Sequence, residues 1–247
     1  MDGTVLCTKS GQTVNTLQGL SVVIPVYNED PRFLTETYCE LSLMGAEVII
    51  VNDGNTVDLP DDINQVRYVP NMGYGYAIKR GIERATNQTV MTIDGDSQHQ
   101  IKDVLKLYQV FKLRDDLAMV VGSRWNIHDS SLRWIFRKCI NFVASIISSH
   151  YQTDLNSGMR VFRRDIAIGY KSILCDTFSF TTSLTMSIVT DGYKIVYFPI
   201  DVLPRKYGKS SVKLFKDGMV TLYYVVWIGL ALRTRKLRSW IRHLLGQ

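Results

Sequence analysis

Two aspartates one residue apart, Asp94 and Asp96, are the residues of this sequence best suited to hold a metal ion. They directly follow a predicted strand, 89–93, and Gln98 supplies a neutral oxygen two residues further on. Two carboxylates on one side of an extended segment suit a hard divalent cation such as Mg²⁺ or Mn²⁺, which can neutralise a diphosphate leaving group. A turn built on Asp-Gly would explain the same residues more simply, so the interpretation depends on their surroundings.

Polar residues also follow three other predicted strands, at the point where each strand ends. Alone, such a group is more often a turn or a helix cap than a binding site. Together the groups would line one crevice, because ligands of parallel α/β sheets bind beyond the carboxyl ends of the strands. The groups are Tyr27-Asn28-Glu29 after strand 20–26, Asn52-Asp53-Gly54 after strand 47–51, and Gly122-Ser123-Arg124 after strand 117–121.

The elements that must position these residues alternate between strand and helix. Asp30 and Pro31 begin a helix that Gly45 ends, and apolar spacing predicts further helices over 75–85 and 101–113. This alternation predicts a Rossmann-like α/β fold, a mostly parallel sheet with helices on both faces. The predicted strands are 20–26, 47–51, 66–69, 89–93 and 117–121.

Length and composition fit one large folded domain. The chain has 247 residues, of which 46% are hydrophobic and 21% charged, a balance that excludes a disordered or collagen-like chain. Its four cysteines, at 7, 39, 139 and 175, lack metal-ligand spacing, so we expect reduced thiols and neither a zinc site nor a disulfide framework. The first nineteen residues contain no apolar run of signal-peptide length, and we expect the protein on the cytosolic side.

Net positive charge is concentrated toward the C-terminal end. Residues 205–247 hold ten Lys or Arg and one acidic residue, whereas the rest of the chain carries a net charge of −3. Such a tail favours an anionic surface. Its basic residues flank an apolar segment instead of alternating with aromatics along a sheet, which favours the cytosolic face of a membrane over nucleic acid.

Two apolar segments are candidates for contact with that membrane. Residues 218–232 are uncharged but only fifteen long, fewer than the roughly twenty that cross a bilayer as a helix. We therefore expect a peripheral, interfacial helix, or a docking surface for a partner such as a small membrane subunit. Residues 132–147 form a second helical stripe with cations near its start. Burial in the core would explain either segment without a membrane.

The motifs of residues 20–215 resemble, in their order, those of inverting family-two glycosyltransferases, in particular polyprenyl-phosphate sugar transferases of the dolichyl-phosphate mannose synthase type. The resemblance implies an A-type nucleotide-sugar glycosyltransferase fold over 20–211, with a nucleotide-sugar half at 20–124 and an acceptor half at 125–211. A flexible arm, 1–19, would precede it, and an interfacial helix with a basic tail, 212–247, would follow. The motifs are SVVIPVYNE (21–29), IIVNDG (49–54), NMGYG (71–75), DGDSQH (94–99), GSR (122–124), DLNSGMR (154–160) and RKYGKS (205–210).

The resemblance also implies roles for individual residues in an inverting transfer from a GDP- or UDP-linked sugar to a polyprenyl phosphate. The nucleoside would lie against Pro25, Tyr27, Glu29 and Asp53, with Gly73 in a tight turn beside them. Mg²⁺ or Mn²⁺ and the donor diphosphate would be held by Asp94, Asp96 and Gln98, and Arg124 would meet phosphate or sugar. The acceptor phosphate would lie in a basic cradle of Lys138, Arg160, Arg205 and Lys209. Catalysis would rest on Asp94, Asp96, Arg124, Arg160 and Arg205.

The sequence departs from the family pattern at three places. Asn52-Asp53 replaces a double aspartate, Ser211 stands where a lysine is frequent, and Thr181-Thr182-Ser183 replaces a segment that often carries Gln and Glu. A sugar hydroxyl must lose a proton to attack and needs a carboxylate base, whereas a phosphate oxygen is already anionic and needs positioning. The absence of an acidic residue from 181–183 therefore favours a phospholipid acceptor, and a base supplied by Asp154 or another residue is the alternative.

Two other functions fit part of the pattern. A haloacid-dehalogenase-like phosphohydrolase would use Asp94 as nucleophile and Asp96 as acid and base, although its D-x-D normally follows the first strand. An inactive glycosyltransferase-like subunit would use the basic tail to bind a membrane or a partner. Failure to bind any nucleotide with Mn²⁺ would favour that second alternative.

Overall fold

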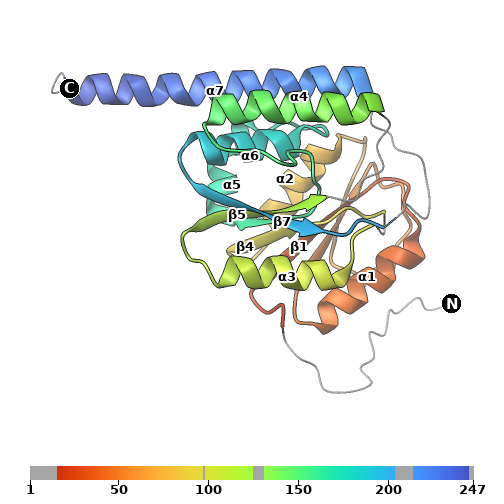
Figure 1. Ribbon diagram of the computed structural model, residues 1–247. Helices are drawn as coiled ribbons and strands as arrows, with labels where there is room; N and C mark the ends of the chain where they lie inside the picture. Colours follow the sequence, from red (N-terminus) through yellow and green to blue (C-terminus); the bar gives the residue numbers. More distant parts are fainter. Residues whose placement is uncertain (1–15, 97, 125–130, 204–213, 245–247) are drawn as a thin grey trace.

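A seven-stranded sheet lies between two sets of helices (Figure 1). The sequence predicts this layering and five of the seven strands. The computed structural model describes residues 16–96, 98–124, 131–203 and 214–244. The strand order is β3-β2-β1-β4-β6-β5-β7, in which β6 runs antiparallel to both neighbours and the other pairs are parallel. The strands are β1 (Leu20–Val26), β2 (Glu47–Asp53), β3 (Gln65–Tyr68), β4 (Thr89–Thr92), β5 (Leu117–Arg124), β6 (Arg160–Arg163) and β7 (Lys194–Ile200).

The helices form unequal layers on the two faces of the sheet (Figure 1). Helices α1 and α3 cover one face, α2, α5 and α6 cover the other, and α4 and α7 lie side by side outside α6. The helices are α1 (Pro31–Leu43), α2 (Tyr74–Arg84), α3 (Ile101–Lys112), α4 (Ser131–Ser148), α5 (Arg164–Tyr170), α6 (Phe180–Thr190) and α7 (Leu214–Leu244), with a 3₁₀ turn at Lys171–Ile173.

Strand β1 contributes side chains to the hydrophobic cores on both faces of the sheet. Val22 and Ile24 pack with α1 and α3, whereas Val23 packs with α2 on the opposite face, as expected for a buried strand whose side chains alternate. A Cβ at Gly81 would lie 2.2 Å from the Val23 side chain, so this glycine lets α2 approach the sheet closely. The predicted start of α1 is confirmed, since the Asp30 side chain accepts the N–H of Arg32 at 2.9 Å and Pro31 follows it.

Helix α7 is a continuous helix of 31 residues and extends past the rest of the domain at its C-terminal end (Figure 1). One side of it, formed by Thr221, Val225, Ile228 and Leu232, is buried against α4 and α6. The expected apolar segment is therefore partly a core element. Within the parts of the chain that the structure describes, no helix combines the length and apolar character that crossing a bilayer requires.

Two expectations about the N-terminal region need adjustment. Leu17 is fully buried, and its N–H donates to the Met44 carbonyl at 3.0 Å, so the folded domain begins before Leu20.

Cys39 is disulfide-bonded, contrary to the expectation of reduced thiols, whereas Cys139 and Cys175 are free. Cysteine spacing in a sequence does not reveal which thiols the fold brings together.

Candidate active site

The carboxyl ends of β1, β2, β4 and β5 lie at one edge of the sheet, because these strands run in the same direction. Strand β6 runs the other way, so the loop that precedes it reaches the same edge. This loop brings Asp154 and Gly158 to the edge where the sequence predicts the polar strand ends. The predicted convergence of these strand ends at one edge of the sheet is confirmed.

Asp94 lies at the centre of this edge and is contacted from three sides. The Tyr74 hydroxyl donates to its Oδ1 at 2.9 Å, and Nε2 of His99 lies 3.3 Å from its Oδ2. A Cβ at Gly158 would lie 2.3 Å from each carboxylate oxygen. Burial opposes ionisation of Asp94, but the hydrogen bond and charge of His99, with Tyr74 and Arg124, outweigh it and lower the pKa to about 2. The carboxylate is thus ionised at neutral pH.

Glu29 and Asp96 bring further negative charge to Asp94. Burial raises the pKa of Glu29 to about 7, in spite of its hydrogen bond from the N–H of Tyr27, and the charges of Asp96 and Asp94 raise it further. Oδ1 of Asp96 accepts the N–H of Gln98 at 3.2 Å. The three acidic residues therefore lie close enough to repel one another, which a cation would relieve.

This arrangement fits a cation that is shared with a substrate. Within the described residues, no three His, Cys, Asp or Glu side chains are arranged to enclose a metal ion. Mg²⁺ in nucleotide sites is usually bound by one or two carboxylates together with substrate phosphates and waters, not by an all-protein cage. Ionised Asp94 and neighbouring Asp96 match the number and type of such donors, and their binding of a metal ion stays a prediction.

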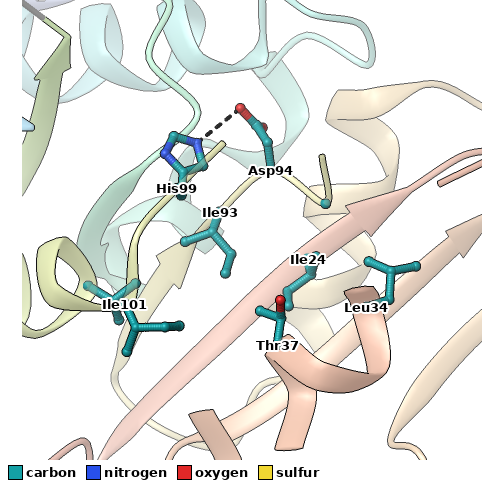
Figure 2. A pocket seen from close by; sticks show the side chains of 9 residues that line it. Ile24, Leu34, Thr37, Ile93, Asp94, His99 and Ile101 are labelled. Atoms are coloured by element: carbon teal, nitrogen blue, oxygen red, sulfur yellow. Dashed lines mark hydrogen bonds and ion pairs between the residues drawn. The ribbon is translucent and has the colours of Figure 1, made fainter. Parts of the chain in front are cut away.

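A small, largely apolar pocket lies beneath Asp94, between β1, α1 and α3 (Figure 2). Asp94 and His99 stand at one side of it and face each other. Because apolar side chains form most of its wall, the pocket supports the loop after β4 and offers few groups to bind a nucleotide. Its lining consists of Ile24, Leu34, Thr37, Ile93, Asp94, Gly95, His99, Ile101 and Val104.

Arg124 is joined to Asp154 by a bidentate ion pair. Its Nε and one terminal nitrogen each donate to the carboxylate at 2.8 Å, and its backbone N–H donates at 3.1 Å. The Asp154 side chain is 2% exposed and that of Arg124 is 23% exposed. Burial disfavours the charged form of Asp154, but the charge and hydrogen bonds of Arg124 outweigh this effect and lower the pKa of Asp154. The pair fixes the guanidinium at the crevice edge, where the sequence predicts it.

The last two residues of β2 have a structural role that the sequence does not predict. Both oxygens of Asp53 accept backbone N–H groups, from Met72 at 2.7 Å and Gly73 at 2.8 Å, and the residue is 3% exposed. Asn52 is fully buried, and its Nδ2 donates to the Val57 carbonyl at 2.6 Å. These side chains shape the loops around the crevice, and contact of Asp53 with a nucleoside stays a prediction.

Arg160 contradicts the predicted phosphate cradle. It is fully buried, and its three nitrogens donate to the carbonyls of Leu155, Ser157 and Thr181 and to the Thr185 hydroxyl. Burial lowers its pKa to about 10, so the guanidinium is charged at neutral pH. With its N–H groups satisfied inside the protein, Arg160 ties α6 to the loop before β6 and does not face an acceptor.

The other predicted residues lie at different depths. Pro25 is buried within β1 and Tyr27 is 50% exposed beside the crevice. Gly73 has φ +104°, and a Cβ there would lie 2.7 Å from the Asp176 carbonyl, which confirms the tight turn. The Gln98 amide donates to the Leu203 carbonyl at 3.0 Å, so its metal contact stays a prediction. Lys138 is exposed on α4, over the Trp134 ring, and Arg205 and Lys209 lie outside the described residues.

Three residues of the site were not identified from the sequence as contacts of the central carboxylate. In the sequence, Tyr74, His99 and Gly158 stand only as members of motifs, without individual roles. The available signal is position along the chain, since Tyr74 directly follows the Gly73 turn and His99 lies three residues after Asp96 of the D-x-D. Only the tertiary structure shows that all three converge on Asp94.

The fold and the strand-end carboxylates define the A-type class of nucleotide-sugar glycosyltransferases. Residues 21–174 match Glycosyl transferase family 2, which is more than half of the chain, and the chain belongs to that family. It is therefore a glycosyltransferase that uses a nucleotide-sugar donor. The match decides against the phosphohydrolase, as does the position of Asp94 after β4 and not after the first strand.

Similar proteins agree with this assignment. An uncharacterised protein of Methanocaldococcus jannaschii is 27% identical over 222 residues, 83% of this chain and 90% of that protein. The undecaprenyl-phosphate 4-deoxy-4-formamido-L-arabinose transferase of Erwinia tasmaniensis is 25% identical over 229 residues, 86% of this chain. The chain spans 68% of the length of that transferase and 65% of the one from Sodalis glossinidius.

Solved structures share the fold. Glucosyl-3-phosphoglycerate synthase from Mycobacterium tuberculosis, in complex with Mn²⁺, UDP-glucose and phosphoglyceric acid, superposes with a TM-score of 0.66. The alignment covers 90% of this chain and 86% of that chain at 15% identity. The same synthase in complex with Mg²⁺ and UDP has a TM-score of 0.60. At this identity the likeness establishes the fold alone.

Proposed function

We propose that this glycosyltransferase moves a sugar from a GDP- or UDP-linked donor to a polyprenyl phosphate, with inversion at the anomeric carbon, at the cytosolic face of a membrane. The observation that carries the proposal is the convergence of Glu29, Asp94 and Asp96 at the carboxyl edge of the sheet, where burial first, and then the charges of Asp96 and Asp94, raise the pKa of Glu29. The names of the undecaprenyl-phosphate relatives support the acceptor class.

Asp94 and Asp96 would hold the cation, and the fit rests on ionised Asp94 and on mutual repulsion of the carboxylates. A bound Mg²⁺ or Mn²⁺ supplies positive charge that stabilises the departing diphosphate. Arg124, fixed by Asp154, adds a guanidinium at the same edge and would orient donor phosphate or sugar. The chain's own contribution is alignment and charge at fixed positions.

A phosphate acceptor suits the residues at the start of α6. Thr181, Thr182 and Ser183 are buried there, and the Thr182 hydroxyl donates to Oδ1 of Asn156 at 2.7 Å. Hydroxyls at these positions cannot act as the base that a sugar hydroxyl requires, whereas an anionic phosphate oxygen needs none. With Arg160 buried, the cradle for this phosphate reduces to Lys138 and the predicted Arg205 and Lys209.

A membrane surface is supported by the outward sides of α4 and α7. Large apolar side chains that the domain leaves exposed gather on this helix pair, and Lys138 and Arg233 lie on the same two helices. Aromatics beside cations suit the headgroup region of an anionic bilayer. The exposed side chains are Trp134, Ile135, Phe142 and Ile146 on α4, and Met219, Tyr223, Val226, Trp227 and Leu230 on α7.

A transfer assay with an Asp96→Asn variant tests the proposal. UDP- and GDP-sugars are screened with Mn²⁺ by thermal shift, and the donor that binds is supplied with a short polyprenyl phosphate. We expect Asp96→Asn to lose roughly a hundredfold or more in turnover, together with metal-dependent donor binding, while its unfolding temperature without ligand stays unchanged.

Asp165→Asn on the exposed start of α5 is the matched control and should transfer sugar like the unmodified protein. Unchanged turnover in Asp96→Asn would refute the metal role. A chain that binds no nucleotide with Mn²⁺ would instead favour the inactive-subunit alternative, and transfer to a free sugar but not to a lipid phosphate would overturn the acceptor class.

A further inference from the structure

We propose that Tyr74, His99 and Gly158 are positioning residues that hold the Asp94 carboxylate in one orientation toward the cation. This inference rests on the proposed function, because it assumes that Asp94 binds the cation of the donor complex. It adds to that function a rigid support built by residues from α2, from the loop after β4 and from the loop before β6.

Tyr74 contacts the carboxylate from the α2 side. Its hydroxyl donates to Oδ1 of Asp94 at 2.9 Å, and its ring stacks on Phe178 with centroids 5.6 Å apart. The preceding Gly73 is held by the bond from its N–H to Asp53 at 2.8 Å. Asp53 therefore anchors the start of α2, and Phe178 limits rotation of the Tyr74 ring.

His99 contacts the other oxygen. An ionised carboxylate only accepts hydrogen bonds, so Nε2 of His99 carries the proton that it donates to Oδ2 of Asp94 at 3.3 Å (Figure 2). The imidazole is 5% exposed. On either side of His99, the Gln98 and Gln100 amides donate to the carbonyls of Leu203 and Asp201, at 3.0 and 3.2 Å. These bonds fix the loop that carries the imidazole.

Gly158 closes the third side by backbone contact. A Cβ at this position would lie 2.3 Å from both carboxylate oxygens of Asp94, so a larger residue would displace the carboxylate. The Thr92 hydroxyl donates to the Gly158 carbonyl at 2.6 Å and holds this backbone in place. Asp94 is thus confined by a hydroxyl, an imidazole and a peptide.

Such confinement should matter for metal affinity more than for folding. Groups that orient a metal ligand typically contribute between 10- and 100-fold to metal affinity or activity when they are removed. A carboxylate with one allowed orientation loses little conformational entropy when the cation arrives, whereas a freed carboxylate must be ordered again.

Tyr74→Phe is the first test, because it removes the hydroxyl and keeps the ring that stacks on Phe178. Mn²⁺ affinity is measured by the electron paramagnetic resonance signal of free Mn²⁺, with UDP or GDP present. We expect roughly tenfold weaker Mn²⁺ binding in Tyr74→Phe and an unchanged unfolding temperature without metal. The control is Tyr76→Phe on the same helix, whose ring packs edge-on against Tyr68 and should bind Mn²⁺ normally.

A second pair of variants isolates the hydrogen bond of His99. His99→Gln retains an N–H donor, whereas His99→Phe keeps a ring of similar size without one. We expect Mn²⁺ binding to weaken roughly tenfold in His99→Phe and to be largely restored in His99→Gln. This comparison decides the matter even where Tyr74→Phe alters stability.

The outcomes separate this inference from the proposed function. If the unmodified protein fails to bind Mn²⁺ both in the presence of UDP and in the presence of GDP, the proposed function fails and the inference fails with it. If the unmodified protein binds Mn²⁺ but the phenylalanine variants bind equally well, only the inference is overturned. Equal losses in His99→Gln and His99→Phe would also overturn it.

Discussion

The acidic residues at the strand ends differ in pKa, and the difference has a measurable effect on stability. Glu29 has its pKa raised to about 7 by burial and by the charges of Asp96 and Asp94, whereas the pKa of Asp94 is lowered to about 2. Below its unfolded pKa of 4.5, Glu29 is protonated in both folded and unfolded chains. As the pH rises from about 4.5 to about 7, the unfolded chain loses this proton while the folded chain still holds it, so stability falls across this range, and above about 7 the loss is complete.

Glu29→Gln should therefore gain stability over the unmodified protein as the pH rises. We expect the two proteins to have nearly equal free energies of unfolding below pH 4.5 and Glu29→Gln to be more stable by about 3 kcal/mol at pH 8, because the pKa is about 7 in the folded chain and 4.5 in the unfolded chain. Unfolding temperatures at the two pH values, measured with a chelator present, provide the check. A stability difference that does not change with pH would contradict this account.

The sequence predicts the site residues whose position follows from the strand topology. It does not predict those whose position depends on side-chain packing. Glu29, Asp94 and Asp96 follow parallel strands, so topology alone brings them to one edge. The prediction that Arg160 binds the acceptor phosphate is wrong. A charged residue in a sequence normally indicates exposed surface, whereas Arg160 is buried and backbone carbonyls accept its N–H groups in place of water. The Tyr74 bond to Asp94 depends on how α2 packs, which no local pattern encodes.

The elements show a similar contrast. Strands β1 to β5 and helices α1 to α3 are predicted from apolar runs and capping residues, although β5 extends beyond the predicted end to Arg124. Strands β6 and β7 are not predicted. Strand β6 has four residues and lies between two partners, so it shows no alternation, and β7 contains Pro199. The stripe at 132–147 divides in the structure, since Ile140 faces the core while Phe142 and Ile146 are exposed.

Glycine substitutions test how closely α2 approaches α6. A Cβ at Gly75 would lie 2.2 Å from the Cys175 carbonyl oxygen and 2.8 Å from the Phe180 Cβ, and neither can move freely. We expect Gly75→Ala to lower the free energy of unfolding by about 1–3 kcal/mol in chemical denaturation.

Gly169→Ala on α5 is the opposite case, because a Cβ there meets nothing within 4 Å. Alanine should stabilise this helix by about 0.5–1 kcal/mol. A Gly75→Ala variant that is as stable as the unmodified protein, or more stable, would show that contact with α6 does not limit position 75.

At the scale of the whole molecule, the proposed membrane surface predicts selective loss of lipid binding. The double variant Phe142→Ser and Trp227→Ser removes one exposed apolar side chain from each of α4 and α7. We expect its binding to vesicles that contain phosphatidylglycerol to weaken at least roughly tenfold in a sedimentation assay, because each side chain gives up burial in the interface.

The matched control is Leu113→Ser, at the end of α3 on the other face of the sheet, where the side chain is 84% exposed. It should bind vesicles like the unmodified protein. Equal losses in the two variants would place lipid contact elsewhere, and no loss in either would remove α4 and α7 from it.

The antiparallel strand β6 also limits how this enzyme can be recombined. It belongs to the half of the chain after Arg124, yet it pairs with β4 of the first half on one side and with β5 on the other. A cassette cut after Arg124, at the end of the predicted nucleotide-sugar half, would lack the strand that joins β4 to β5. Chimaeras that exchange the predicted nucleotide-sugar half must therefore include β6, with the crossover point beyond Arg163.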